Sequence, residues 1–152
     1  MSPAQKRAWL LAGALGGTVL VLDQVVKAVI ESELVPGEQI DLLGPVGLTL
    51  AHNEGVAFGL AGGGALPLVA FALLALGFVG YVFGRNATVR RLWVAAGLVG
   101  GGALGNLVDR LRIGEVTDYV EVGSWPPFNF ADVAITAGVV VFALIFLRED
   151  QA

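Results

Sequence analysis

Five acidic residues are the groups in this sequence best suited to catalysis. They lie where predicted helices end or in the segments between them, at Asp23, Glu54, Asp109, Asp118 and Asp132. The sequence has no cysteine and one histidine, which excludes thiolate nucleophiles and thiolate metal sites. It also lacks an H-E-x-x-H zinc motif, and its serines lack the sequence context of a serine protease. A hydrolase built from these residues must therefore use carboxylates.

Asp118 and Asp132 are the strongest candidates for an acid–base pair. Each lies among apolar and aromatic neighbours, in Val-Thr-Asp-Tyr-Val and Phe-Asn-Phe-Ala-Asp respectively. Two carboxylates brought together in such surroundings do not both ionise easily, so one keeps a proton and the other acts as a base. The base would activate a water molecule, and the acid would protonate the leaving nitrogen of a peptide, with no metal or cofactor. The alternative is that Asp132 only caps its helix.

Asp23, Lys27 and Asp109 have structural interpretations as well. Asp23 and Lys27 are four residues apart on one helix and share a face, so they form either an ion pair or a contact with substrate. Asn106, Asp109 and Arg110 close a glycine-rich segment, and such a polar cluster at the end of a membrane helix is typical of a hydrogen-bonded brace.

Composition indicates that membrane helices position these groups. The chain has 152 residues, of which 56% are apolar and 14% are charged, too few polar residues to cover a water-soluble domain. A helix needs about 20 mostly apolar residues to span a bilayer, and four segments qualify, at about 8–30, 65–84, 92–108 and 130–147. We therefore expect an all-α integral membrane protein with one domain over residues 1–152. Gly97, Gly101 and Gly105 recur every four residues and predict a smooth helix face for close packing.

The basic residues predict the orientation of these spans. Lysine and arginine are retained in cytoplasmic loops. Six of the nine flank the termini or join the second and third spans, whereas eleven of the thirteen acidic residues lie toward the opposite side. Both termini should therefore be cytoplasmic and the polar chemistry should lie at the outer face. The first apolar run is too long for a cleavable signal peptide, so we expect a retained helix.

Two outer segments complete the predicted organisation. In residues 35–58, apolar residues nearly alternate on both sides of Gly44-Pro45, which predicts a short β-hairpin or two small strands. Residues 113–129 include Trp125-Pro126-Pro127, which favours a rigid loop at the membrane interface.

Five strings in the sequence resemble the motifs of lipoprotein signal peptidase, also called signal peptidase II, over nearly the whole chain. The first holds Asp23 and Lys27, and the second, at 53–58, matches N-x-G-x-A-F. The third, at 101–110, matches G-G-x-x-G-N-x-x-D-R, and the last two hold Asp118 and Asp132. This family consists of aspartyl peptidases that mature bacterial lipoproteins.

The resemblance implies a catalytic pair and a set of residues that shape the site or hold substrate. The pair is Asp118 and Asp132. The shaping set is Asp23, Lys27, Asn53, Gly55, Asn106, Asp109, Arg110 and Asn129.

The resemblance also implies partners and a location. The substrate would be a prolipoprotein carrying diacylglyceryl on the cysteine after the cleavage point, presented at the outer face of the bacterial cytoplasmic membrane. Globomycin-type cyclic peptides would inhibit the enzyme, which we expect to be a monomer in contact with membrane lipid. The sequence has no basic patch with interleaved aromatic residues, so we do not expect nucleic acid as a partner. The rival interpretation is a non-enzymatic four-helix carrier or channel component whose outer acids bind cations.

Overall fold

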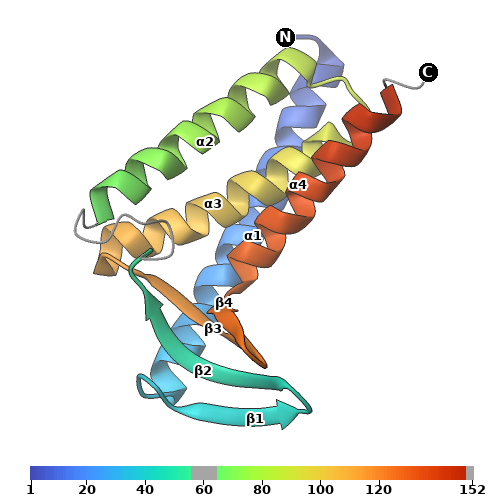
Figure 1. Ribbon diagram of the computed structural model, residues 1–152. Coiled ribbons are helices and arrows are strands. Elements are labelled where there is room, and N and C mark those ends of the chain that lie inside the picture. Colours follow the sequence, from blue (N-terminus) through green and yellow to red (C-terminus); the bar gives the residue numbers. More distant parts are fainter. Residues whose placement is uncertain (56–64, 150–152) are drawn as a thin grey trace.

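Four helices form a bundle that carries a small sheet at one end (Figure 1). In this computed structural model, which describes residues 1–55 and 65–149, the helices are α1 (Pro3–Glu33), α2 (Ala65–Asn86), α3 (Leu92–Ile113) and α4 (Phe130–Glu149). All four are long and apolar enough to cross a membrane, which confirms the predicted four-helix membrane class. Each predicted span lies inside one of these helices. Most of the helices extend further because good helix formers such as glutamine, lysine and arginine continue them past the apolar stretch.

Local sequence signals set the start of α1 and the end of α3. Ser2 and Gln5 form a reciprocal capping box at the start of α1, with Pro3 at the first helical position. At the other end of the bundle, Gly114 terminates α3 with φ +84°, and its N–H donates to the Arg110 carbonyl. Glycine adopts this left-handed conformation without steric cost, so the chain turns directly from α3 into the sheet.

α3 lies at the centre of the bundle and packs against the other three helices. The predicted glycine face makes its close contact with α1 possible. A Cβ atom at Gly101 would lie 2.5 Å from the Gly16 carbonyl oxygen, and one at Gly97 would lie 2.9 Å from the Ala12 carbonyl oxygen. Gly105 is equally restricted, since a Cβ there would lie 2.5 Å from the Asp23 carboxylate. These glycines confirm the predicted packing face and bring α3 up to the acidic end of α1.

The sheet has four antiparallel strands in the order β1-β2-β3-β4. β1 (Gln39–Leu43) and β2 (Val46–Asn53) form the hairpin predicted within residues 35–58, of which residues 56–58 lie outside the described part of the chain. β3 (Val116–Val122) pairs with β2 and places Asp118 opposite Ala51. The sheet thus joins the segment after α1 to the segment after α3.

The interfacial loop predicted over residues 113–129 is wrong in part, because β3 and β4 (Trp125–Phe128) occupy most of it. The run Val116 to Val122 is rich in β-branched and aromatic residues and fits a strand. Pro126 and Pro127 fit in β4 because this strand is at the edge of the sheet, where one side of the strand needs no donors.

The sheet is fixed to the bundle by an apolar cluster at the end of α1. Ile30 and the adjoining Leu34 pack with Leu50 of β2 and Tyr119 of β3, all of them buried. The N-terminus and the last turn of α4 lie at the opposite end of the bundle from the sheet (Figure 1). Asp118 on β3 and Asp132 near the start of α4 lie at the end of the bundle that carries the sheet.

Candidate active site

Asp118 and Asp132 come together around one asparagine. Asp118 lies on β3 and is only 2% exposed, whereas Asp132 lies in the first turn of α4 and is half-buried. The side-chain amide of Asn129 donates to Asp118 Oδ1 at 2.7 Å, and the backbone N–H of Asn129 donates to Asp132 Oδ2 at 3.2 Å. Two carboxylates from separate elements therefore share a single neighbour.

Asn129 also begins α4. The Asp132 N–H donates to Asn129 Oδ1 at 2.9 Å, which completes a reciprocal capping arrangement with the bond from Asn129 N to Asp132. Asp132 thus caps its helix, which is the alternative role predicted for it from the sequence. The same contact fixes the carboxylate beside Asp118, so the two roles are compatible.

Asn53, at the end of β2, holds the other oxygen of Asp118. Its side-chain amide donates to Asp118 Oδ2 at 2.9 Å, and its own side-chain oxygen accepts from Gly55 N at 2.8 Å. Gly55 has φ +76°, and a side chain there would collide with Leu68 of α2. Glycine at this position therefore allows the turn that aims Asn53 at the carboxylate.

The surroundings of Asp118 favour its protonated form. Burial raises the pKa of this carboxyl group from 3.8 to about 6, against the opposing effect of the hydrogen bond from Asn53. The negative charge of Asp132 raises the pKa further, while the hydrogen bond from Asn129 and the positive charge of Lys27 lower it. Asp118 therefore titrates near pH 6, closer than an ordinary aspartate to the neutral range in which a carboxyl group serves best as a general acid or base.

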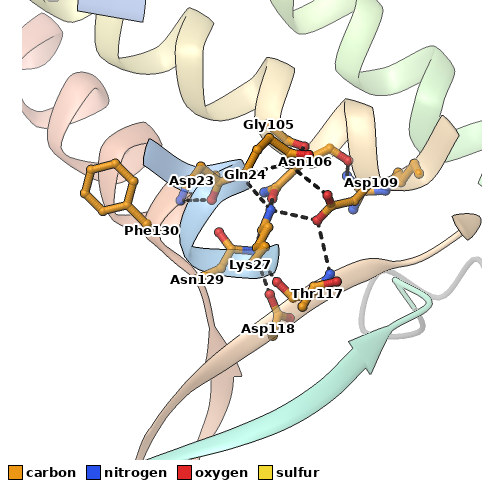
Figure 2. A network of polar contacts seen from close by, with 12 residues as sticks. Asp23, Gln24, Lys27, Gly105, Asn106, Asp109, Thr117, Asp118, Asn129 and Phe130 are labelled. Atoms are coloured by element: carbon orange, nitrogen blue, oxygen red, sulfur yellow. Dashed lines mark hydrogen bonds and ion pairs between the residues drawn. The ribbon is translucent and has the colours of Figure 1, made fainter. Parts of the chain in front are cut away.

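A buried ion-pair cluster of Asp23, Lys27 and Asp109 lies close to Asp118 and Asn129 (Figure 2). Lys27 Nζ lies 2.8 Å from Asp23 Oδ2 and 2.7 Å from Asp109 Oδ2, and all three side chains are essentially inaccessible to solvent. The ion pair predicted between Asp23 and Lys27 is present, and Asp109 joins it as the predicted brace. Gln24 completes the cluster by donating to both carboxylates, at 3.2 Å and 2.9 Å.

Each carboxylate of this cluster also holds an element that carries a candidate catalytic residue. Asp109 Oδ2 accepts from the backbone N–H of Thr117, next to Asp118 on β3, at 3.2 Å. Asp23 Oδ1 accepts from the backbone N–H of Ala131, next to Asp132 on α4, at 3.0 Å. The cluster therefore positions the strand and the helix relative to each other.

Asn106 connects the ion-pair cluster to the aspartate pair. Its side-chain oxygen accepts from Lys27 Nζ at 3.0 Å and from Asn129 Nδ2 at 3.1 Å. Its amide donates to Asp132 Oδ1 at 2.8 Å. Arg110 lies one turn further along α3, where Nη1 donates to the Asn106 carbonyl at 3.4 Å and the buried Nε has no partner among the described residues.

Asp132 borders an open groove between β4 and α4. The groove has a volume of about 430 Å³ and is lined mainly by apolar side chains, including Trp125, Phe128 and Val133. The site therefore combines a buried carboxyl group, a more accessible carboxylate and an adjacent apolar surface. Within residues 1–55 and 65–149, no three potential metal ligands converge.

All ten residues predicted for the site lie in or beside this network, whereas Glu54 is exposed at the end of β2. Prediction from the sequence missed the contributions of Gln24, Thr117 and Tyr119. The Tyr119 hydroxyl accepts from the first helical N–H of α4, at 3.1 Å from Phe130 N. Gln24 and Thr117 adjoin motif aspartates, which is the signal that could have identified them.

Known proteins match most of this chain. A family model described as signal peptidase (SPase) II matches residues 10–148. The chain is 39% identical over 140 residues to a lipoprotein signal peptidase of Desulfitobacterium hafniense, covering 89% of this chain and 91% of the relative. It is 43% identical over 156 residues to one from Pseudomonas fluorescens, covering 94% and 89%. A solved structure of a bacterial membrane enzyme aligns with TM-score 0.83 and 29% identity, covering 90% of this chain and 92% of that one.

Proposed function

This chain belongs to the signal peptidase II family and is therefore a multi-pass membrane peptidase of lipoproteins, and we propose that Asp118 and Asp132 are its catalytic pair. The observation that carries the proposal is their convergence on Asn129 from two different elements. Asp132 also borders an open groove, which a purely structural role would not require.

The proposed reaction is a direct attack of water on the peptide carbonyl. Asp132, which has two N–H donors and the helix N-terminus to stabilise its negative charge, takes a proton from the water molecule. The oxygen of that water forms a bond to the carbonyl carbon while protonated Asp118 donates a hydrogen bond to the oxyanion. The C–N bond then breaks as Asp118 gives its proton to the leaving nitrogen, and the proton that Asp132 took from water passes to Asp118, which restores the starting state. This sequence needs no metal, so a chelator should leave turnover unchanged.

The raised pKa of Asp118 supports this division of roles. A carboxyl group with a pKa near 6 holds a proton more readily than an ordinary aspartate. Asp118 is also the more deeply buried of the two, whereas Asp132 meets the groove from which water and substrate enter. We therefore assign the acid to Asp118 and the base to Asp132.

We propose a prolipoprotein carrying diacylglyceryl as the substrate, cut immediately before the lipidated cysteine. The acyl chains of such a substrate stay in the bilayer, so its scissile bond lies near the membrane surface. The sheet and the aspartate pair lie at one end of helices long enough to span a bilayer. This location supports the proposed substrate. We also propose that globomycin-type cyclic peptides inhibit the enzyme.

The distribution of charge supports an active site at the outer face of the bacterial cytoplasmic membrane. Six of the nine basic residues belong to segments at the end of the bundle opposite the sheet. Because basic residues are retained on the cytoplasmic side of a membrane, we propose that both termini are cytoplasmic and that the sheet faces outward. We further propose that one chain suffices for activity, because Asn53, Asn106 and Asn129 hold Asp118 and Asp132 in place through bonds within a single chain.

Cleavage of a diacylglyceryl-modified prolipoprotein by purified protein tests the catalytic pair. We expect Asp118→Asn and Asp132→Asn each to lower turnover by roughly 10²–10⁴-fold, the usual contribution of a positioned acid or base. The matched control is Asp41→Asn, which removes an exposed carboxylate from β1 of the same sheet and should leave turnover unchanged. Turnover within a few-fold of wild type in either active-site variant would reject the pair.

A further inference from the structure

A second groove lies at the other end of the bundle from the aspartate pair. It has a volume of about 600 Å³ and lies between the start of α3 and the last turns of α4. Its walls are apolar, with Val94 from α3 and Val141 and Ile145 from α4. Arg90 and Arg91, which end the α2–α3 connection, also line it and are both exposed. The groove therefore joins an apolar channel to two guanidinium groups.

The charge of this end of the molecule favours an anionic ligand. Lys6, Arg7 and Arg85 belong to the same end as the two arginines of the groove. Among the described residues, the only acidic residue at this end is Glu149, in the last turn of α4. Arginine is well suited to phosphate because its planar fork of donors matches two phosphate oxygens at once.

We propose that this groove binds an anionic phospholipid. Its phosphate lies between Arg90 and Arg91, and one acyl chain follows the apolar walls formed by Val94, Val141 and Ile145. Basic pockets between membrane helices are a known kind of site for acidic lipid head groups. The volume also lies within the range of small-molecule sites, about 300–1,000 Å³.

The position of the groove favours a lipid over the peptide substrate. Ile145 lies 13 residues beyond Asp132 on α4, so the groove and the aspartate pair are separated by roughly 20 Å along the helix axis. The groove lies at the ends of helices long enough to span a bilayer, which is where phospholipid head groups meet a membrane protein. This inference is independent of the proposed peptidase chemistry.

Quenching of Trp93 by brominated lipid tests the proposal. Trp93 follows the two arginines and packs in the same cluster as Val89, Val141 and Ile145. With Trp9 and Trp125 replaced by phenylalanine, it becomes the single tryptophan reporter, because the sequence has three tryptophans. This protein would be reconstituted into phosphatidylcholine bilayers to which a small fraction of phosphatidylglycerol, either brominated or not, is added.

We expect brominated phosphatidylglycerol to quench Trp93 well beyond its fraction of the bilayer, and brominated phosphatidylcholine not to do so. Arg90→Gln with Arg91→Gln should lower the apparent affinity about thirtyfold, since each basic residue at a membrane surface contributes about fivefold. The matched control, Arg7→Gln with Arg85→Gln, removes two exposed charges from the same end without touching the groove.

Two outcomes would overturn the proposal. Equal quenching by the two brominated lipids would show that the groove does not select an anionic head group. Equal losses in the groove variant and the control would show attraction by surface charge alone. Should the double groove variant fail to insert, the two single arginine variants carry the same test with about fivefold expected effects.

Discussion

Replacing Asp118 by asparagine should change the pH dependence of stability in a way that reports the ionisation of this buried carboxyl group. Its pKa in the folded protein is about 6, compared with 3.8 as the ordinary value. The folded state therefore binds this proton more tightly than the unfolded state. As pH rises from about 4 to about 6, the contribution of Asp118 to stability falls, because the folded protein must then hold a buried negative charge.

The size of the effect follows from the shift in pKa. A difference of about two units corresponds to about 3 kcal/mol between the fully protonated and fully ionised limits. Between about pH 4 and pH 8, about 2.5 kcal/mol of this appears, because protonation of the unfolded chain is already incomplete at the lower pH. The asparagine side chain carries no charge, so Asp118→Asn should gain about 2.5 kcal/mol relative to wild type across this interval.

The assay compares thermal midpoints of wild type and Asp118→Asn in detergent micelles at both pH values. The asparagine cannot accept from both Asn53 and Asn129, which costs about 1–3 kcal/mol. That cost is the same at each pH and cancels when the two differences are subtracted. For a chain of this size, the remaining shift corresponds to roughly 5–10 °C in midpoint.

Exposed Asp41 on β1 provides the control, since Asp41→Asn should show no comparable dependence on pH. A constant difference between wild type and Asp118→Asn at all pH values would refute the reasoning. It would mean that Asp118 titrates as an ordinary carboxylate despite its burial, and the assignment of the acid to this residue would fail with it.

Further predictions concern the pH profile of activity and the residues that support the pair. The kcat/KM of the wild type should fall as pH rises through about 6, as Asp118 loses its proton, in a pH–rate profile with a diacylglyceryl-modified substrate. Lys27→Met should lower stability by about 3–5 kcal/mol in detergent unfolding, since it leaves two buried carboxylates without their cation, and adding Asp23→Asn should recover part of the loss. Gly101→Ala should separate α1 from α3 and lower the thermal midpoint, whereas Gly100→Ala, where the added methyl meets open space, should not.

The four helices and the hairpin could be predicted because their signals are local. Apolar length identifies a membrane helix, and near-alternation around Gly44-Pro45 identifies a turn between strands. The strands at 116–122 and 125–128 differ from the predicted interfacial loop, which rested on the aromatic residues and the two prolines of the second strand. Only the order of strands reveals that this second strand is an edge and tolerates them.

The membership of the site could be predicted, but its connections could not. Asp118 and Asp132 were singled out by their apolar surroundings and by the motifs that hold them. Asn129 makes contacts with Asp118, Thr117 and Asn106 that depend on how β3, α3 and α4 meet, and no spacing in the sequence encodes that geometry. The same holds for Lys27, whose neighbour Asp23 is local but whose second partner, Asp109, comes from another helix.

The bond between Asp23 on the first helix and the backbone of Ala131 on the last joins residues 108 positions apart. A chain emerging from the ribosome therefore lacks this bond until its final helix has entered the bilayer. Three inserted helices leave the strand bearing Asp118 without its partner Asn129, so a nascent or truncated chain has no assembled site. On the proposed assignment of Asp118 and Asp132, hydrolytic activity therefore requires all four helices to be in place.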